Sequence, residues 1–596
     1  MIKFPYGICD FYKIITEGYF YVDRTDKIPL IEESGQQLLF LRPRRFGKSL
    51  LLTTLENYYD LAKADQFEQL FGHLAIGQNP TPLHNQYLVM RWDFSVVKSY
   101  GPIEGVEQAL HSHLNVQITN FTLYYQQFLD EKVRIDYGNA VASFESLLGV
   151  VQRSPYRFYL LIDEYDNFAN EILMGGRPDS RRRYEELLHG EGIFKTVFKA
   201  IKSGGAGRGL DRAFITGVSP VVMSDATSGY NIAENIYLEP AFNDLCGFWE
   251  SEIETALQQI VAECDFPVEK AAEALETMRT FYNGYTFSSH IDELIYNPTL
   301  ALYYMKHFQR HCQAPRNLLD SNFAMDRAKI SYISQLPGGE PLVLDAVETP
   351  GLVVPMLADR FGVAEMSRPQ QDPTFMASLL YYLGVLTLGG ETPSGELLLT
   401  IPNLLVRKLY LERVQEMFLP DSLERYAGYQ AAKLLYQRGE MQPLCNFVQE
   451  RYFKALDNRD YCTANELTIK IAFLTLLFND LLYVMDSETA LERSYADLTM
   501  IIRPGKRHYQ LWDILIEFKY LGLKELDLSG AAVRATSTVG LRALPQVAKK
   551  LAQAQAQLQN YRTVLQARYG DALRLRAYAV VSLGFDRLVW EEIKAD

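Results

Sequence analysis

A short apolar run, a polar loop and an amphipathic pattern follow one another near the start of the chain. Leu38–Leu41 has the length and composition of a buried strand, Arg42–Ser49 ends in Gly-Lys-Ser, and Ser49–Leu55 has helical spacing. This order constrains the fold more than any other feature, because it brings backbone N–H groups and a helix N-terminus to one point. It predicts a phosphate-binding site on an α/β sheet.

The loop resembles the motif G-x-x-x-x-G-K-[ST] without its first glycine. Arg42 takes that place, where a β-carbon narrows the allowed backbone, although Pro43 already fixes a neighbouring φ. We therefore expect a loop of different shape that still binds phosphate. Gly47 would let the backbone approach the phosphates, Lys48 would reach the β/γ oxygens, and the Ser49 hydroxyl would hold Mg²⁺.

A second apolar run ends in two acids. Phe158–Ile162 is followed directly by Asp163 and Glu164. A phosphate loop requires an acid at the end of a neighbouring buried strand, to position Mg²⁺ and the attacking water. We expect Asp163 to hold Mg²⁺ through water and Glu164 to polarise the attacking water.

Two further apolar runs complete the predicted sheet. Tyr87–Trp92 lies between the loop and the acidic pair, and we expect it to be the extra strand of the additional-strand ATPase class. Ala213–Thr216 leads to two candidate sensors of the γ-phosphate, Thr216 and Ser219, and Thr216 is preferred because it directly ends the apolar run. The alternation of such runs with helical patterns, for example Ile103–Leu114, predicts a parallel sheet covered by helices.

Several motifs together resemble the AAA-ATPase-like family of bacterial proteins, through about residue 300. They are Tyr6-Gly7-Ile8, Tyr21–Thr25, Arg42–Ser49, Asp163–Asp166, Thr216–Pro220, Ser228–Ile232 and Tyr282–Tyr285. The Arg-Pro-Arg-Arg-Phe-Gly-Lys-Ser form of the loop is usual in that family, so the resemblance implies that Arg42 is a family feature. It also implies ATP and Mg²⁺ as cofactors, with Arg44, Arg45 and Phe46 as further nucleotide-binding residues. From the residues alone, the two arginines either face phosphate or are solvated cations.

The middle of the chain is predicted to be mainly helical. Residues 374–415 have the order helix (Phe375–Leu383), hairpin (Val385–Leu388 with Leu397–Ile401) and helix (Leu404–Val414), which suits a small winged-helix-like unit. Ser422–Arg438 follows as a further helix and leads to the polar Arg438-Gly439-Glu440, where we place the last boundary.

A second group of polar residues lies near the C-terminus. Ser494–Ile502 and Leu511–Tyr520 read as the two strands of a hairpin. Because side chains alternate along a strand, Glu517 and Lys519 project to one face. Asp497, at the start of the first strand, is expected to reach the same edge. Two carboxylates and an ammonium in such a place can bind Mg²⁺ and orient or deprotonate a water for attack on a phosphodiester.

Three more residues are candidates for the same site. The alternative to a metal site is an ordinary hairpin with a solvent-facing Glu–Lys pair. Glu466, on the predicted helix Ala464–Leu477, is a further candidate metal contact, and Gln557 and Tyr561 share one helical face. The set in this order resembles the PD-(D/E)xK nuclease superfamily over roughly residues 445–590. Asp513 is a poor substitute for Asp497, since we place it mid-strand and close to Glu517.

The predicted fold class is α/β, in four parts. They are a P-loop (additional-strand) AAA-ATPase-like domain at 1–245, a helical lid at 246–330, a winged-helix-like and helical connector at 331–440, and a restriction-endonuclease-like PD-(D/E)xK domain at 441–596. The pairing of the first and last parts resembles a known two-part architecture.

Charge and hydropathy narrow the choice of partners. The net charge of −14 argues against a whole-surface nucleic-acid binder, but from Met441 onward 20 Lys and Arg stand against 18 Asp and Glu. DNA or RNA is therefore expected at the C-terminal domain. No apolar run approaches the roughly 20 residues that span a bilayer, and no signal-peptide pattern begins the chain, so we expect a cytoplasmic protein without a membrane partner. A homo-oligomer or a regulatory protein partner stays open.

The sequence thus predicts an ATP-binding and ATP-hydrolysing protein that gates or powers a Mg²⁺-dependent nuclease. The catalytic residues expected are Glu164 at the nucleotide site and Glu466, Asp497, Glu517, Lys519, Gln557 and Tyr561 at the second site. The alternative is a nucleotide-dependent switch or scaffold whose C-terminal domain binds a partner or nucleic acid without cleaving it. Defence against foreign nucleic acid is a hypothesis for the biological setting.

Overall fold

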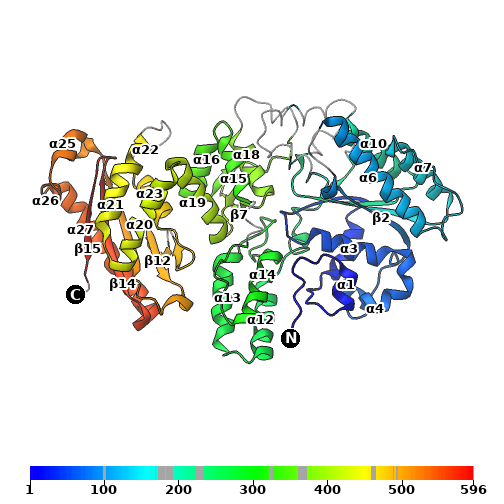
Figure 1. Ribbon diagram of the computed structural model, residues 1–596, viewed down its shortest axis with the longest axis horizontal. Helices are drawn as coiled ribbons and strands as arrows, with labels where there is room; N and C mark the ends of the chain where they lie inside the picture. The colour runs from blue at the N-terminus through cyan, green and yellow to red at the C-terminus, as the bar shows by residue number, and fades with distance from the viewer. Residues whose placement is uncertain are drawn as a thin grey trace. The chain divides into compact units, whose positions relative to one another are not determined.

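The computed structural model divides into two compact units (Figure 1). Unit 1 comprises Met1–Cys312, Asp320–Leu342 and Gly351–Pro402, and unit 2 comprises Gln313–Leu319, Val343–Pro350 and Asn403–Asp596. The structure describes residues 1–97, 102–167, 170–171, 182, 192–221, 232–320, 326–359, 361, 372–457, 465–486, 489–491 and 494–594. Most of the predicted motif Ser228–Ile232, and Ala464 at the predicted helix start, lie outside these residues. The predicted connector at 331–440 contains residues of both units, and the four-part division stays a prediction.

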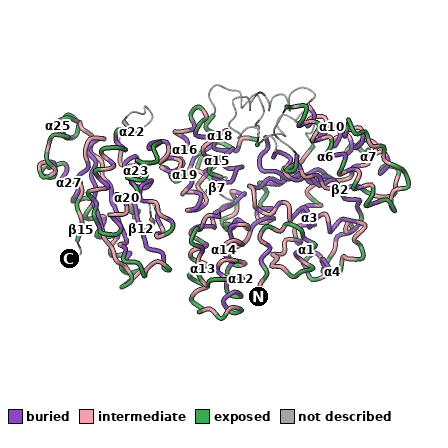
Figure 2. The backbone as a smooth tube through the Cα atoms, in the orientation of Figure 1, coloured by how far each residue is buried: buried purple, intermediate pink, exposed green. Residues whose placement is uncertain are grey.

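Unit 1 is built on a parallel five-stranded sheet, as the sequence predicts. Its order is β2-β3-β4-β1-β5, with β1 at Gln37–Leu41, β2 at Tyr87–Asp93, β3 at Arg157–Asp163, β4 at Arg212–Gly217 and β5 at Glu234–Asn235. Helix α3 (Lys48–Tyr59) lies on one face, and α6 (Ile103–Tyr124), α7 (Ala140–Arg153) and α10 (Ile193–Gly205) lie on the other (Figure 1). Both faces are thus covered, which is why β1 is buried along its whole length. Figure 2 shows the chain around the label β2 of this sheet mostly in the colour of buried residues.

The sequence-based choice of the extra strand is wrong. The strand that separates β1 from β3 is β4, whereas Tyr87–Trp92 forms most of β2 at the sheet edge beyond β3. Apolar runs predict where strands form, but the order of strands along the chain does not determine their order across the sheet. The insertion of β4 brings Thr216 next to both the loop strand and the acidic strand.

Helices and a small sheet follow in unit 1. The helices α12 (Glu250–Cys264), α13 (Glu269–Tyr282) and α14 (Pro298–His311) pack together. Later, α18 (Pro373–Tyr382), β7 (Thr387–Glu391) and β8 (Leu397–Thr400) confirm the predicted helix and hairpin, and β6 (Leu352–Val354) adds a third strand in the order β6-β8-β7.

Unit 2 contains a mixed five-stranded sheet in the order β15-β14-β13-β12-β9. Its elements follow in the sequence α23 (Glu466–Leu477), β9 (Tyr483–Asp486), β12 (Leu498–Ile502), β13 (Asp513–Leu521), α27 (Pro545–Tyr569), β14 (Leu575–Leu583) and β15 (Arg587–Ile593). Strands β9, β12 and β13 are antiparallel neighbours, and β13 and β14 are parallel, with α27 packed against them. Helices α19 (Leu404–Phe418) and α20 (Ser422–Arg438) also belong to this unit.

The predicted hairpin is present with two differences. Its first strand is split into β11 (Ser494–Ala496) and β12, and Asp497 lies at the break. Asp513 begins β13 instead of lying mid-strand, and its buried carboxylate accepts hydrogen bonds from the Ile502 N–H at 2.7 Å and from Arg507 at 2.6 Å. Asp513 therefore ties the closed end of the hairpin together, away from the edge that carries Asp497.

Within the described part of the chain, no helix combines the length and the apolar character that crossing a membrane requires.

Candidate functional site

The phosphate loop joins β1 to α3. Gly47 precedes the first residue of α3 with a φ of 97°, and Arg45 also has a positive φ of 68°. Lys48 is 4% exposed, and its Nζ donates to the carbonyl oxygens of Arg42 at 3.0 Å and Pro43 at 3.2 Å. The ammonium therefore lies inside the curve of the loop, in front of the N-terminus of α3, where a phosphate gains most from both.

Arg42 does not face this curve. Its side chain is 1% exposed and donates 2.7 Å hydrogen bonds to the carbonyl oxygens of Tyr237 and Phe242. Its guanidinium stacks on the rings of Phe40 and Phe287, at 4.5 and 4.0 Å from their centroids. Burial lowers the pKa of Arg42 to about 10. Arg42 is a packing residue of the loop base, and its φ is not positive, so this loop needs no glycine there.

The two acids follow one another at the end of β3. Asp163 is 2% exposed, and its Oδ1 accepts a hydrogen bond from Thr216 Oγ1 at 2.8 Å. Glu164 adopts a left-handed φ of 48°, which is rare outside glycine and is concentrated at functional sites. Burial raises the pKa of the Glu164 carboxyl, and the charges of Lys48 and Arg44 oppose that rise. A buried carboxylate close to the loop cations is placed to accept a proton from a water beside the loop.

Thr216 and Ser219, the two candidate sensors, have different partners. Thr216 lies on β4 between the loop strand and the acidic strand, and its hydroxyl is bonded to Asp163. Ser219 donates through both its N–H, at 2.7 Å, and its hydroxyl, at 2.8 Å, to the buried carboxylate of Asp166. The geometry keeps the preference for Thr216, because Asp166 holds Ser219 in place.

The other loop residues point in different directions. Arg44 donates a hydrogen bond to the side-chain oxygen of Asn167, just beyond β3. Phe46 is 1% exposed and packs edge-on against Tyr285 and Phe287, with centroids 5.0 and 5.2 Å away. Phe46 therefore anchors the loop through its side chain, and only its backbone is available to a phosphate.

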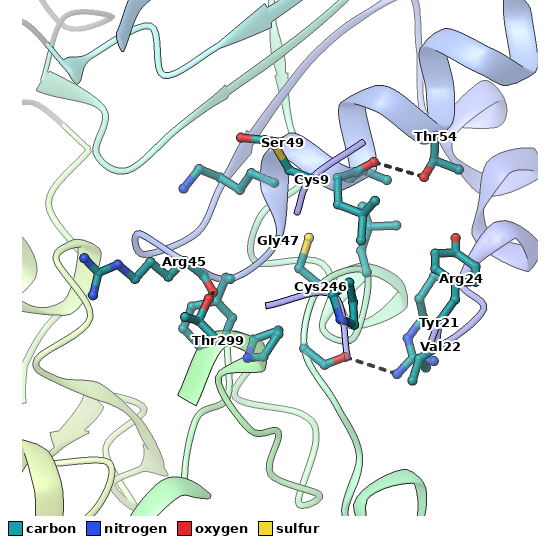
Figure 3. Close-up of a pocket in the computed structure, with 18 of the residues that line it drawn as sticks. Cys9, Tyr21, Val22, Arg24, Arg45, Gly47, Ser49, Thr54, Cys246 and Thr299 are labelled. Carbon is teal, nitrogen blue, oxygen red and sulfur yellow. Dashed lines mark hydrogen bonds between the residues drawn. The ribbon is translucent and has the colours of Figure 1, made fainter. Parts of the chain in front are cut away.

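A cavity of about 310 Å³ opens beside the loop (Figure 3). Arg45–Leu51 line it together with Pro5–Cys9, Phe20–Val22 and Leu245–Phe248. Figure 3 shows Tyr21, Val22 and Arg24 on one side and Arg45 and Thr299 on the other. The wall is mostly apolar with a few polar groups, which is typical of a small-molecule pocket. Sequence reasoning noted the N-terminal motifs but missed that they form this wall, because the contact joins segments far apart in the chain.

Arg24 fixes this wall. Its guanidinium makes a bidentate pair with Glu252 at 2.7 and 2.8 Å and donates to the carbonyl oxygen of Asp244 at 2.8 Å. The N-terminal segment is thereby held to the start of α12.

In unit 2 the predicted residues of the second site come together. Lys519 Nζ donates to Glu517 Oε1 at 2.9 Å and pairs with Glu466 Oε1 at 3.4 Å. The N–H of Phe518 donates to Asp497 Oδ2 at 2.8 Å, which brings the break between β11 and β12 against β13. One ammonium and three carboxylates thus meet where α23 and the break between β11 and β12 face β13, the central strand of the sheet.

Burial and neighbouring charges shift the pKa values of the carboxylates at this second site. Glu517 is 2% exposed, and burial together with the charge of Asp497 raises its pKa to about 7. Its Oε2 is buried and has no hydrogen-bond partner among the described residues. Burial also raises the pKa of Asp497, against the opposing effects of the Phe518 N–H and the charge of Lys470. Burial thus disfavours ionisation of both carboxylates, and the charge of Asp497 adds to this effect at Glu517.

Helix α27 completes the group. Tyr561 is 3% exposed. Burial is the main cause that raises the pKa of its hydroxyl, and the charges of Glu517 and Asp497 raise it further. Gln557 hydrogen-bonds the Tyr561 hydroxyl, as the shared helical face predicts. Sequence reasoning missed Lys470, which is 5% exposed and faces Asp497 from α23. The missed signal was its place one turn after Glu466 on the same helix.

Comparison with known proteins bears on the first site. The model of the AAA-ATPase-like family, described as a predicted AAA-ATPase, matches residues 5–227. The matched part of the chain is similar to this family, and we refer to it as the AAA-ATPase-like domain. The matched residues include the phosphate loop, both acids and Thr216, but no residue of unit 2.

The curated relative and the solved structures that resemble this chain add no information about its function. A curated protein of Azotobacter chroococcum mcd 1, "Uncharacterized protein in vnfD 5'region", is 27% identical over 313 residues, or 52% of this chain and 53% of that protein. The chain thus spans about half the length of the curated relative it matches. Among solved structures, the Walker-type ATPase PABY2304 of Pyrococcus abyssi is 15% identical with a TM-score of 0.35, covering 65% of this chain and 96% of that one. The ORC1 protein of Aeropyrum pernix in complex with DNA is 11% identical with a TM-score of 0.23, covering 66% and 93%. Both TM-scores are low, so neither likeness bears on function.

The residues present fit Mg²⁺ at each site in a different way. No group of three or more His, Cys, Asp or Glu in the described chain forms a ready-made metal cage. At the AAA-ATPase-like domain none is needed, because Mg²⁺ next to a nucleotide takes most of its ligands from phosphates and water, and Ser49 and Asp163 offer the hard oxygens it prefers. At the second site, the buried Oε2 of Glu517 has no hydrogen-bond partner among the described residues, so a cation there would stabilise the ionised form of this carboxylate.

Proposed function

We propose that this protein binds and hydrolyses ATP at the AAA-ATPase-like domain, and that ATP gates or powers a Mg²⁺-dependent nuclease site in unit 2. The observation that carries the first part is the convergence of Lys48, Asp163, Glu164 and Thr216 on the phosphate loop. The second part is carried by the convergence around β13 of Glu466, Asp497, Glu517, Lys519, Gln557 and Tyr561.

At the nucleotide site each residue has one role. Lys48 binds the β/γ oxygens from inside the loop, Ser49 and Asp163 hold Mg²⁺, and Glu164 accepts a proton from the attacking water. Mg²⁺ supplies charge neutralisation of the phosphates when it is bound. The cavity beside the loop takes the nucleoside, since it opens next to Gly47 and Ser49 and is mostly apolar.

Equilibrium binding of a fluorescent ATP analogue tests this part. We expect Lys48→Ala to abolish binding and Glu164→Gln to keep binding but lose hydrolysis, since only the second removes a proton acceptor without touching the phosphate cradle. Unchanged binding in Lys48→Ala would sink the proposal.

At the second site the carboxylates of Asp497 and Glu517 hold Mg²⁺, and Lys519 orients the attacking water or the phosphate. Mg²⁺ supplies, when bound, Lewis-acid polarisation of the phosphodiester. Glu466 pairs with Lys519 and keeps its ammonium at the site, while Tyr561 and Gln557 close the site from α27. The order α23, three antiparallel strands, α27 and a parallel fourth strand supports a restriction-endonuclease-like fold.

Cleavage of labelled DNA and RNA with Mg²⁺ tests this part, with Lys519→Ala as the inactive variant and the exposed Glu591→Gln as a control on the same sheet. Cleavage that Lys519→Ala leaves unchanged would refute the site. No cleavage, with nucleic-acid binding intact in Glu517→Ala, would favour a nucleotide-dependent scaffold. If cleavage is found, equal phage plating on hosts with wild-type protein and with Lys519→Ala would argue against a defence role.

A further inference from the structure

The phosphate loop carries three arginines, and the structure gives them three different surroundings. Arg42 is buried in the loop base and bonded to carbonyl oxygens. Arg45 has a left-handed φ, and its carbonyl oxygen accepts a 2.9 Å hydrogen bond from Thr299 beside the cavity. Arg44 is half-buried and turns toward the end of β3. The same residue type in one short loop thus serves different purposes.

Arg44 lies on the side of the loop where the water-polarising acid stands. Its guanidinium donates to the side-chain oxygen of Asn167. Asn167 belongs to the turn that starts at Glu164, because its N–H donates to the Glu164 carbonyl oxygen at 3.0 Å. The charge of Arg44 also reaches Glu164 itself, since together with Lys48 it counteracts the rise in the pKa of that carboxyl. Lys48 and Arg44 therefore both lie near Glu164, beside the phosphate loop.

We propose that Arg44 is a catalytic arginine supplied by the chain's own phosphate loop, which stabilises the charge of the transferred γ-phosphoryl group. This role rests on the proposed ATP hydrolysis. It removes the need for an arginine from a second subunit at this position.

Arg44 acts during the transfer of the γ-phosphoryl group to water. The oxygen of water forms a bond to the γ-phosphorus while the bond to the β–γ bridging oxygen breaks, and its electron pair leaves with ADP. Glu164 accepts the proton that the water loses, and inorganic phosphate is the other product. During this step negative charge spreads over the phosphoryl oxygens, and a guanidinium fork matches such oxygens in pairs. Arg44 therefore acts more strongly in the transition state than on bound ATP.

The contact with Asn167 also determines where Arg44 lies without a bound phosphate. Asn167 is 5% exposed, and its amide donates to Glu171 at 3.3 Å, so its oxygen is held toward Arg44. A neutral amide binds a guanidinium less strongly than a phosphate does. Asn167 thus holds Arg44 near Glu164 in a position from which Arg44 moves to the phosphoryl group.

Steady-state hydrolysis and equilibrium binding by the purified full-length chain test the proposal. We expect Arg44→Ala to lower kcat by about 10³-fold or more, the range known for catalytic arginines, while the Kd for ATP changes less than about fivefold. Arg44→Lys keeps the charge but loses the fork, so it restores only part of kcat. Binding of ADP with aluminium fluoride, which imitates the transferred phosphoryl group, provides a readout besides activity, and we expect Arg44→Ala to lose it.

Two further variants make the test decisive. Asn167→Ala removes the partner and keeps the arginine, so we expect kcat to fall far less than in Arg44→Ala. Arg208→Ala, an exposed arginine bonded to Ser203, is the unaffected control.

The role is overturned by wild-type kcat in Arg44→Ala, by loss of ATP binding itself in Arg44→Ala, or by an Asn167→Ala variant as inactive as Arg44→Ala. A wild-type chain that neither hydrolyses ATP nor binds ADP with aluminium fluoride overturns the proposed ATPase function together with this role. Unfolding temperatures of all variants show that none of these results comes from misfolding.

Discussion

Replacing Glu517 by glutamine tests the electrostatics of the second site while keeping its shape. Glutamine has nearly the same size as glutamate and retains an oxygen that can accept the 2.9 Å hydrogen bond from Lys519. What it removes is a buried negative charge next to Asp497. The variant should therefore be more stable than the wild type without metal, which is the opposite of most core substitutions.

The size of the effect follows from the pKa. Burial and the charge of Asp497 raise the pKa of Glu517 from 4.5 to about 7, so at about 1.4 kcal/mol per pKa unit the ionised form costs about 3 kcal/mol at pH 8. The folded state binds the proton more tightly than the unfolded chain does. The free energy of unfolding of the wild type therefore falls as pH rises from about 4.5 to 7 and stays low above that. The gap between variant and wild type should grow by about 2 kcal/mol from pH 5.5 to pH 8.

Differential scanning calorimetry of the full-length chain in EDTA measures this gap. We expect the unit 2 transition of Glu517→Gln at pH 8 to lie about 6 to 12 °C above that of the wild type. Mg²⁺ should raise the wild-type transition and leave the variant nearly unchanged, because the carboxylate that binds the cation is gone. Glu591→Gln, on the same sheet but exposed, should show no pH-dependent gap. A gap that does not change with pH, or a variant less stable than wild type at pH 8, would refute the electrostatic reasoning.

Three other variants test further parts of the account. Arg42→Met should lower the free energy of unfolding of unit 1 by about 3 kcal/mol or more, because buried carbonyl oxygens lose their donor; chemical unfolding checks this, and a loss below about 1 kcal/mol would contradict the packing role. Thr216→Val removes the 2.8 Å hydrogen bond to Asp163, so kcat for ATP should fall about 10- to 100-fold with the Kd nearly unchanged; hydrolysis at the wild-type rate would exclude Thr216 as a sensor. Lys470→Met removes the cation that faces Asp497, so Mg²⁺ should raise the unfolding temperature of unit 2 more than in wild type; a smaller rise would contradict that placement.

Local signals explain why much of the architecture could be predicted. The apolar runs before Arg42, Asp163 and Thr216 became buried parallel strands, and the polar residues that end them meet at one edge of the sheet. Parallel strands bring their carboxyl ends together, so a pattern of run and acid is enough to place Asp163. Period-2 alternation likewise put Glu517 and Lys519 on one face of β13.

Features that depend on contacts between distant segments could not be predicted. Sequence cannot tell that Arg42 turns into the core toward Tyr237 and Phe242 while Arg44 turns toward Asn167, because both choices depend on partners more than 100 residues away. The place of β4 between β1 and β3 is a lateral order that chain order does not contain. The cavity wall formed by the N-terminal segment could not be predicted either, because it too depends on contacts between distant segments.

The strained backbone of Glu164 could not be predicted from the sequence either. Glu164 takes a left-handed backbone that its residue type disfavours, within a turn that the Asn167 N–H closes. Lys470 was overlooked because a lysine one turn after a glutamate reads as an ordinary surface pair, whereas here it is buried and faces Asp497.

The measurement that tests the central claim most directly is cleavage of labelled DNA and RNA by the full-length chain with Mg²⁺, with and without ATP. We predict cleavage whose rate depends on ATP, loss of cleavage but not of ATP hydrolysis in Lys519→Ala, and loss of the ATP dependence in Lys48→Ala. Cleavage at the same rate with and without ATP in both the wild type and Lys48→Ala, or no cleavage of either nucleic acid under any of these conditions, would contradict the account.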